Sequence, residues 1–456
     1  MMPNHILVAS EDRKVFLLDI PASIAAAQAF ADEDNSSNDN LERTRLLSCT
    51  PTSAPYASTE PKSASARVKV KNHGKYDALH DIYSRQCEDA LRFVRVAVGS
   101  GHFCLERQLN KPGSAPQKRK RATSPSIETA RKGTDATPDP SKRLRCVVKA
   151  SFPDDPPPSL LFQIDGYVRH RLDAKDPAWT VSSTLGEEKL YAFEVRHWGI
   201  GLACYQNRQE PLKICLKPLD RSPEVHEQHL RIPPGSAFLL GPCHVPAGTR
   251  EFQGLAQLYT DSEDFDMIYL DPPWPNRSAS RQGAAWYRTE RSVYDMEQML
   301  LGMDLGTQLK PQGFIAMWVT NKAACRDLAL SLFKHLKLNV VEEWLYLKLA
   351  ANGEPITSIG GLWRKPYEVL LIARAPRQAS HPPPGVVRRV IAAVPDLHSR
   401  KPHLKSLFDE LLLHDPVLGL PRSKAKVLEV FARNLTVGWM SWGDEVLKYN
   451  WQDHWA

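Results

Sequence analysis

A four-residue turn near the middle of the chain has the composition of a catalytic site. Asp271 is followed by Pro272, Pro273 and Trp274. The Asp271 carboxylate and the Pro272 carbonyl can accept the two hydrogens of an exocyclic amine and direct its lone pair, while Trp274 offers a face for base stacking. Two consecutive prolines would stiffen the turn and pre-organise these acceptors. The structural alternative is a proline-rich turn in which Asp271 is only a cap.

The residues before this turn predict a buried strand. Five of the six residues at 265–270 are apolar or aromatic, which is the pattern of a strand inside a parallel sheet. Pro272 and Pro273 lack backbone donors and end the strand. Asp271 and Trp274 are therefore expected at the carboxyl end of a strand, where open α/β sheets bind their ligands.

Strands and helices alternate over the carboxyl-terminal half of the chain, which predicts one doubly wound α/β domain there. Helical spacing marks residues 322–336 and 403–413. Strands are expected at residues 238–240, 265–270, 313–320, 340–349, 367–373, 387–394 and 425–431. Nearer the amino terminus, residues 1–30 predict a short strand pair and an alanine-rich helix, and residues 76–108 predict a further helix.

The last expected strand ends in a second candidate site. Glu429 and Phe431 fit the acidic residue and the phenylalanine that precede a glycine-rich cofactor turn in methyltransferases, although Ala432, Arg433 and Asn434 replace the glycines. The Asp271 turn lies about 160 residues upstream of this strand. The catalytic turn thus comes first and the cofactor strand last, which is a permuted order.

Several further motifs accompany these two between residues 233 and 449. They are residues 318–321, 365–368, 398–402, 431–435, 438–439, 441–443 and 445–447. Together with residues 271–274 they resemble the MT-A family of adenine-N6 methyltransferases, and most of all its methyltransferase-like protein four branch. The resemblance implies an α/β, Rossmann-like S-adenosylmethionine-dependent methyltransferase domain with permuted motif order, preceded by a smaller mixed α+β accessory domain.

The same resemblance implies methyl transfer to the N6 atom of adenine in RNA. The resemblance to that branch suggests an adenosine that is already 2′-O-methylated, as in small nuclear RNA. Two alternatives stay open: a DNA N6-adenine methyltransferase, and a catalytically weak RNA-binding scaffold subunit. S-adenosylmethionine is the implied cofactor, and the protein is expected to be a monomer.

Cofactor-binding roles also follow from the resemblance. Lys401 would bind the methionine carboxylate of the cofactor, because an ammonium group suits that task as a point charge. Arg433 and Asn434 would reach the ribose hydroxyls, with Asp444 and Glu445 completing the pocket. A helix cap for Lys401 and a plain surface charge for Arg433 are the structural alternatives.

Two departures from the family pattern concern the same pocket. Asp444 stands where the family usually has asparagine, which adds a negative charge. Residues 241–243 are Gly-Pro-Cys where the family has a turn near the cofactor adenine. Pro242 offers neither a carboxylate nor a backbone donor, so weaker adenine binding is expected.

A loop after the catalytic turn has the composition of a nucleic-acid contact. Arginines alternate with Trp286 and Tyr287 in residues 276–294, which suits phosphate binding together with base stacking. The candidate substrate-binding residues are Arg277, Arg281, Tyr287, Arg288, Arg291, Arg364 and Lys365. A solvated loop is the structural alternative for the arginines, and core packing is the alternative for Tyr287.

Charge and composition suggest four regions. The predicted regions are residues 1–110, partly helical with a disordered segment at 32–65; a basic linker at 111–157; the accessory domain at 158–232; and the methyltransferase domain at 233–456. Residues 111–145 hold ten Lys or Arg against three acids, which alone equals the chain's net charge of +7. This segment is interpreted as a nuclear import signal, a phosphate-binding arm or a solubilising linker.

Residue usage bears on the location of the protein and on its metal content. The basic segment favours the nucleus, with the cytoplasm as a second location. Eight cysteines show no metal-binding spacing, so no metal is expected and the thiols are expected to be reduced. Charges interrupt the apolar runs of the first 18 residues, so an intracellular soluble protein without a signal peptide or membrane partner is expected.

Overall fold

The computed structural model describes the chain in separate ranges. These are residues 3–28, 45–57, 63–65, 76–109, 146–151, 179–183, 190–195, 203–206, 212–218, 228–240, 243, 256, 264–275, 292–361, 364–376, 385–397, 400–413, 425–443 and 445–456. Among the described helices, none combines the length and apolar character needed to cross a lipid bilayer.

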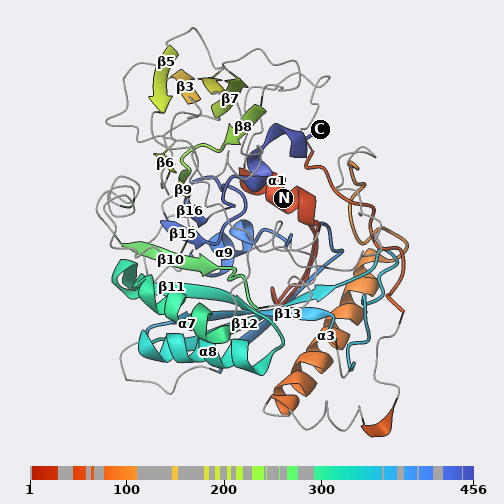
Figure 1. Ribbon diagram of the computed structural model, residues 1–456. Coiled ribbons are helices and arrows are strands. Elements are labelled where there is room, and N and C mark those ends of the chain that lie inside the picture. Colours follow the sequence, from red (N-terminus) through yellow and green to blue (C-terminus); the bar gives the residue numbers. More distant parts are fainter. Residues whose placement is uncertain are drawn as a thin grey trace, which may run out of the picture.

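Eleven strands form one mixed sheet in the order β1-β2-β14-β12-β13-β11-β10-β15-β16-β9-β6 (Figure 1). The strands are β1 (Ile6–Ala9), β2 (Val15–Leu18), β6 (Ala203–Gln206), β9 (Ala237–Leu240), β10 (Phe265–Leu270), β11 (Leu309–Val319), β12 (Asn339–Lys348), β13 (Tyr367–Arg374), β14 (Val387–Ala393), β15 (Val427–Val430) and β16 (Trp439–Gly443). From β11 to β9 neighbouring strands run parallel. The antiparallel β13 separates β11 from β12.

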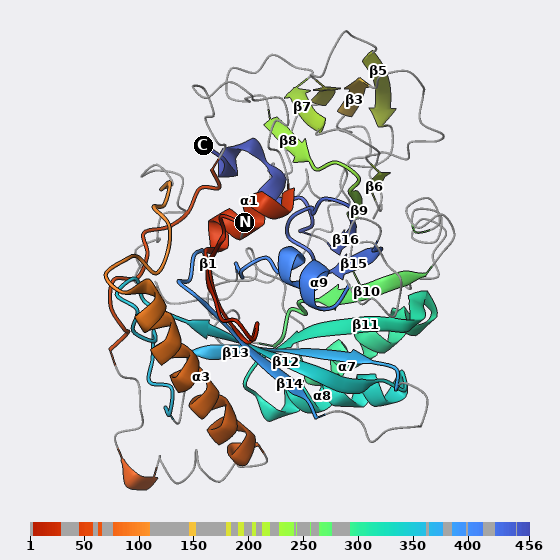
Figure 2. The same ribbon diagram turned by 180° about the vertical axis from the view of Figure 1, so that it is seen from behind.

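Helices cover both faces of this sheet (Figures 1 and 2). One face packs against α3 (Asp77–Val98), α7 (Val293–Gly302) and α8 (Ala323–His335), and the other against α1 (Ile20–Gln28) and α9 (Lys405–Leu411). Each face therefore has its own hydrophobic core.

Strand β10 shows why the sequence before the candidate site is so apolar. Ile268 and Leu270 pack into the core beside α7 and α8, whereas Met267 and Tyr269 pack into the core beside α9. Successive side chains of a strand point to opposite faces, so a strand covered on both sides needs apolar residues at nearly every position. The strand ends at Leu270, and the turn begins with Asp271.

A second sheet precedes the carboxyl-terminal half in sequence. It has five strands in the order β5-β3-β4-β7-β8, namely β3 (Cys146–Ser151), β4 (Trp179–Ser183), β5 (Leu190–Val195), β7 (Leu212–Pro218) and β8 (Gln228–Ile232). The described residues from 146 to 232 all lie in strands. Strand β6 lies between β5 and β7 in sequence, but it belongs to the large sheet, where it pairs with β9.

The elements predicted in the carboxyl-terminal half are confirmed, each within a few residues of its expected bounds. The strand pair and the helix expected in residues 1–30 and the helix expected near residues 76–108 are also present. Helix α7 and strand β16 were not predicted from the sequence. Short or mixed apolar runs explain both omissions, because local periodicity is weak over so few residues.

The large sheet extends beyond residues 233–456. Strand β2 pairs in parallel with β14, and β6 adds an antiparallel edge beside β9. Strand β3 also lies inside the region 111–157 that was predicted as a linker. The sheet thus recruits segments from other predicted regions, and the four-region division itself stays a prediction.

Part of the segment predicted to be disordered is packed against the carboxyl terminus. Leu46 is buried and forms a bridge with Trp455, while Ser48 forms a bridge with Leu109. Residues 45–57 therefore correct the expectation of disorder over 32–65, because their backbone groups find partners in distant segments. Most of the rest of that segment lies outside the described residues.

Candidate active site

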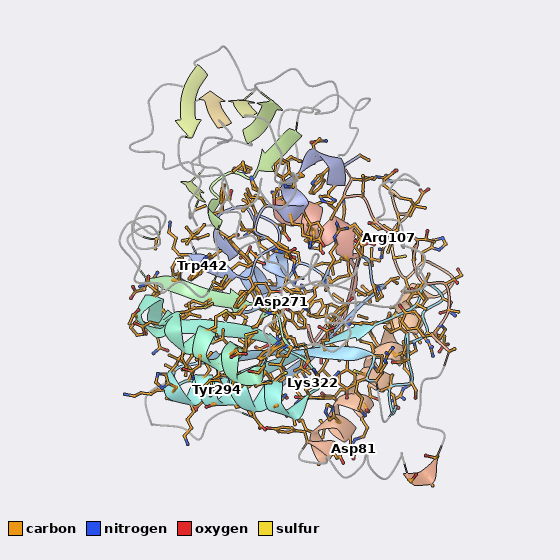
Figure 3. All side chains as sticks on the ribbon, viewed as in Figure 1. Asp81, Arg107, Asp271, Tyr294, Lys322 and Trp442 are labelled. Carbon is orange, nitrogen blue, oxygen red and sulfur yellow. The ribbon has the colours of Figure 1, made fainter. Side chains whose placement is uncertain are left out.

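The turn after β10 is hydrogen-bonded and lies near the centre of the molecule, where Figure 3 labels Asp271. The Trp274 amide donates to the Pro272 carbonyl at 2.8 Å, and the Asp271 amide lies 3.4 Å from the Val430 carbonyl of β15. The Trp274 indole Nε1 donates to the Trp318 carbonyl at 2.8 Å, and Trp274 is only 7% exposed. Its ring is part of the core here, and its role in base stacking stays a prediction.

Lys401 lies against the Asp271 carboxylate. Its Nζ donates to Asp271 Oδ1 at 2.7 Å and to Oδ2 at 2.8 Å, and it lies 3.5 Å from Glu368 Oε2. The ammonium group also lies 5.3 Å from the centroid of the Trp318 ring. Burial opposes the charge on Lys401, but Asp271 and Glu368 outweigh this effect and raise the pKa of its ammonium group.

Arg433 approaches the same carboxylate from the turn after β15. Its NH1 lies 3.8 Å from Asp271 Oδ2, and its Nε lies 3.5 Å from Glu445 Oε2. Glu445 also pairs with Lys448 at 2.8 Å. Asn434 is buried, and its amide donates to the Leu435 carbonyl at 3.4 Å. The structure thus brings Asp271, Lys401, Arg433 and Glu445 into one chain of alternating charges.

The turn that carries Arg433 is tight although it lacks the expected glycines. Phe431 takes a left-handed conformation, with φ of 63°, which costs a non-glycine residue about 1–2 kcal/mol. The following Ala432 amide donates to the Trp442 carbonyl at 3.1 Å. A Cβ at Gly443 would lie 2.9 Å from the Ala432 carbonyl oxygen. The glycine that permits this close approach therefore lies on β16 and not in the turn itself.

Glu429 belongs to the site; the sequence placed it in the motif before the cofactor turn but not among the predicted binding residues. It pairs with Tyr269 in the register of β10 and β15. Burial, and then the negative charge of Asp271, raises the pKa of Glu429 to about 8, with Arg433 opposing the shift. Its Oε2 is buried without a hydrogen-bond partner in the described part of the chain. The signal in the sequence was an acid inside an otherwise apolar strand.

Glu368 is a second residue that had no predicted role, although it lies in the motif at residues 365–368. Its carboxylate pairs with Lys348 of β12 and lies near Lys401. Burial opposes its ionisation, but Lys348 and Lys401 lower the pKa of Glu368 to about 2. Glu368 is therefore ionised and helps to keep Lys401 charged beside Asp271.

The remaining predicted residues lie elsewhere or outside the described ranges. Arg364 is exposed and Lys365 is half-buried, just before β13. The charge of Lys365 contributes to the lowered pKa of His80, which is caused mainly by burial. The predicted residues that lie outside the described ranges are Arg277, Arg281, Tyr287, Arg288, Arg291, Asp444 and Pro242. Their roles stay predictions.

The side chains present fit the chemistry of S-adenosylmethionine. The amino-acid part of that cofactor has a carboxylate, which suits Lys401 and Arg433, and an ammonium group, which suits the ionised Glu368. Glu445 offers acceptors for ribose hydroxyls, and the unpartnered Glu429 Oε2 offers a further one. In the residues that the structure describes, no group of three or more His, Cys, Asp and Glu side chains is arranged to hold a metal ion.

The candidate site thus lies at the carboxyl ends of two adjacent parallel strands, β10 and β15, as ligand sites do in open α/β sheets. Residues 265–445 match the family described as MT-A70. The protein therefore carries an MT-A70 domain, and the site described above lies within it.

Curated relatives share this half of the chain. A protein of Cryphonectria parasitica named N6-methyladenosine RNA methyltransferase MTA1 is 43% identical over 228 residues, which are 49% of this chain and 62% of that protein. Human N(6)-adenine-specific methyltransferase METTL4 is 29% identical over 237 residues, or 50% of this chain and 45% of METTL4. A Caenorhabditis elegans protein named DNA N6-methyl methyltransferase is 29% identical over 212 residues, or 45% and 49% of the two chains. The chain thus spans roughly half to three fifths of these relatives.

Proposed function

We propose that this protein is an S-adenosylmethionine-dependent methyltransferase that modifies the N6 atom of adenine in RNA. The observation that carries the proposal is the Asp271 carboxylate at the end of β10, contacted by Lys401 at 2.7 and 2.8 Å and approached by Arg433 at 3.8 Å. An acceptor is thereby placed beside two cations that can hold an anionic cofactor group. The MT-A70 match and the names of the relatives support the same chemistry.

The turn can hold and orient an adenine amine. Asp271 and the Pro272 carbonyl accept the two amine hydrogens; the Pro272 oxygen already accepts one hydrogen from Trp274, and its second lone pair stays available. Two acceptors on one amine pull its nitrogen toward tetrahedral geometry and direct its lone pair. As positive charge develops on that nitrogen, the Asp271 carboxylate stabilises it.

The neighbouring charges would hold the cofactor. S-adenosylmethionine, when bound, supplies an electrophilic methyl group on a sulfonium sulfur. Lys401 and Arg433 would bind its carboxylate, while Glu445, Asn434 and Asp444 would bind the ribose side. Because Lys401 also occupies both oxygens of Asp271, its engagement with a cofactor carboxylate would leave Asp271 more capacity to accept the amine hydrogens.

Several finer features belong to the same proposal. We infer that the motif order is permuted, with the catalytic strand β10 before the cofactor strand β15, and that the sheet β5-β3-β4-β7-β8 belongs to an accessory domain. The proposed substrate is 2′-O-methyladenosine in small nuclear RNA, and the proposed location is the nucleus. The relatives named for RNA and for DNA make DNA adenine the competing substrate.

Product analysis on matched oligonucleotides tests the proposed function. The protein would be incubated with S-adenosylmethionine and RNA, 2′-O-methylated RNA or DNA of one sequence, and the digested nucleosides measured by mass spectrometry. We expect N6-methyladenine products, with the largest yield from 2′-O-methylated RNA. The greatest yield from DNA would instead assign the DNA substrate. Product from none of the three, together with cofactor-independent RNA binding, would favour a scaffold and refute the enzyme.

A further inference from the structure

A buried ion-pair group connects the amino-terminal region to the loop before Lys401. Asp396 Oδ1 lies 3.1 Å from Arg107 NH1, and Asp396 Oδ2 lies 2.6 Å from Arg400 NH1. The three side chains are only 3%, 0% and 1% exposed for Arg107, Asp396 and Arg400. We call these residues the Asp396 group. Figure 3 labels Arg107 toward the amino-terminal segments and away from Asp271.

The side chains of the Asp396 group also form hydrogen bonds with backbone groups of the amino-terminal region and of the residues after β14. Arg107 NH2 donates to the Val394 carbonyl at 2.9 Å, at the start of the loop that follows β14. From the other side, Arg400 NH1 donates to the Leu47 carbonyl at 2.8 Å, and the Cys49 amide donates to Asp396 Oδ1 at 3.2 Å. Two amino-terminal segments, residues 45–49 and 105–109, therefore hold Val394, Asp396 and Arg400, which lie shortly before Lys401 in the chain.

This loop ends at the candidate site. Arg400 is followed directly by Lys401, whose Nζ contacts both oxygens of Asp271. The Arg400 guanidinium also lies 4.2 Å from the centroid of the Tyr449 ring, and the Tyr449 amide donates to the Arg433 carbonyl at 2.9 Å. Arg400 is thus bonded directly to the backbone of Lys401, and it contacts Tyr449, which binds the backbone of Arg433.

The chemistry of the Asp396 group favours positioning over plain stability. A buried ion pair is a weak source of stability, because desolvation offsets much of the attraction, and apolar residues often hold a core as well. What charged hydrogen bonds add is direction: a guanidinium donates in fixed directions within one plane. A lysine side chain is flexible, so its ammonium group has a defined place only when its backbone is fixed.

We propose that Arg107, Asp396 and Arg400 are positioning residues that hold Lys401 against Asp271. Arg107 lies outside residues 265–445, the part that matches MT-A70, so a segment outside the matched domain sets the geometry of the site. The effect on methyl transfer rests on the proposed function, whereas the placement of Lys401 does not.

Lysine labelling reads this placement directly. Folded protein would be treated briefly with an acetylating N-hydroxysuccinimide ester, and acetylation at Lys401 measured by mass spectrometry relative to the exposed Lys14. In the wild type the ion pair with Asp271 should protect Lys401. Arg107→Leu and Asp396→Asn should each increase labelling of Lys401 about tenfold without changing Lys14, as loss of a charged hydrogen bond implies. Cofactor affinity by calorimetry should fall by a similar factor.

Two variants separate positioning from a general loss of stability. Arg95→Leu is the control, because it also removes an amino-terminal arginine that contacts the carboxyl-terminal half of the chain. Arg95 binds Glu354 and the Gly353 carbonyl there. This variant should leave Lys401 protected. Arg107→Lys keeps the charge, so Lys401 should be better protected in this variant than in Arg107→Leu. Arg107→Lys also replaces Arg107→Leu in the experiment if the leucine variant does not fold. Each variant would be labelled at a temperature that lies the same number of degrees below its own melting temperature.

The outcomes bear on the two proposals separately. Unchanged Lys401 labelling in folded Arg107→Leu and Asp396→Asn, or an equal increase in Arg95→Leu, would overturn the positioning role. Increased labelling in the Asp396 group variants would support it even if the wild type methylated no oligonucleotide, a result that would count only against the proposed function.

Discussion

Replacement of Glu429 by glutamine should make the protein more stable at neutral and alkaline pH. Glu429 is 8% exposed on β15, and its Oε2 has no hydrogen-bond partner in the described ranges. Burial, reinforced by Asp271 and opposed by Arg433, raises the pKa of Glu429 to about 8. Glutamine has nearly the same shape and does not titrate, so the variant isolates the effect of the charge.

The sign and size follow from the two protonation equilibria. The unfolded chain releases the Glu429 proton near its ordinary pKa of 4.5, whereas the folded protein keeps it up to about pH 8. Between these values the folded state binds more protons, so the free energy of unfolding falls as pH rises. At about 1.4 kcal/mol per pH unit, the loss is on the order of 3 kcal/mol at pH 7 and approaches about 5 kcal/mol above pH 8.

Urea unfolding followed by tryptophan fluorescence, without cofactor, measures this loss. The stability of Glu429→Gln minus that of the wild type should be under about 1 kcal/mol at pH 5, about 3 at pH 7 and about 5 at pH 9. Glu88→Gln, on an exposed position of α3, is the control and should give no such growth. A Glu429→Gln variant that is less stable at every pH would show that Glu429 is ionised and hydrogen-bonded, and would refute the reasoning.

Three further substitutions test the site and its surroundings. Lys401→Met removes the ammonium group beside Asp271 and should weaken S-adenosylmethionine binding by about 10- to 100-fold in calorimetry; unchanged affinity would exclude Lys401 from the pocket. Tyr269→Phe removes the oxygen that accepts from Trp318 Nε1 at 2.6 Å and should cost about 1–3 kcal/mol of stability in urea unfolding, so a change below about 0.5 kcal/mol would contradict this bond. Gly353→Ala places a Cβ 2.3 Å from the Phe103 ring at a φ of 79° and should cost at least about 1–3 kcal/mol. Gly360→Ala, which meets open space, should change stability by less than about 0.5 kcal/mol, and equal losses in the two glycine variants would refute the steric argument.

The carboxyl-terminal half of the fold was predictable because its signals are local. The apolar run of β10 and the two prolines after it fix both the strand and its end. The helical spacing of α8 and the apolar run of β13 are equally direct. The confirmed elements are those whose side-chain pattern repeats over enough residues to separate a period of 2 from one of 3.6.

Pairing between distant segments was not predictable in the same way. Nothing near Val15–Leu18 indicates that β2 pairs with β14 more than 370 residues later. Six of the thirteen residues at 45–57 are Ser, Thr or Pro, yet this stretch is ordered because remote segments supply partners for its backbone. Such contacts depend on the assembled sheet and have no local pattern.

The residues of the candidate site were predicted better than the contacts between them. Asp271, Lys401, Arg433 and Glu445 were all named, and the structure brings them together. The bond between Lys401 and Asp271, 130 residues apart, was not foreseen, because Lys401 was expected to face a cofactor carboxylate. The raised pKa of Glu429 was also missed, since it depends on burial that only the packed strands create.

The most direct test of Asp271 as the hydrogen-bond acceptor that orients the adenine amine compares the wild type with Asp271→Asn. Both proteins, shown to be folded by circular dichroism, would receive S-adenosylmethionine with a trideuterated methyl group and the best RNA substrate. The labelled N6-methyladenine nucleoside would then be quantified by mass spectrometry. The wild type should form it, and Asp271→Asn should form at least about 100-fold less, as expected for loss of a charge that stabilises the transition state. Equal amounts of labelled product from the two proteins would contradict the assignment of this turn as the catalytic site.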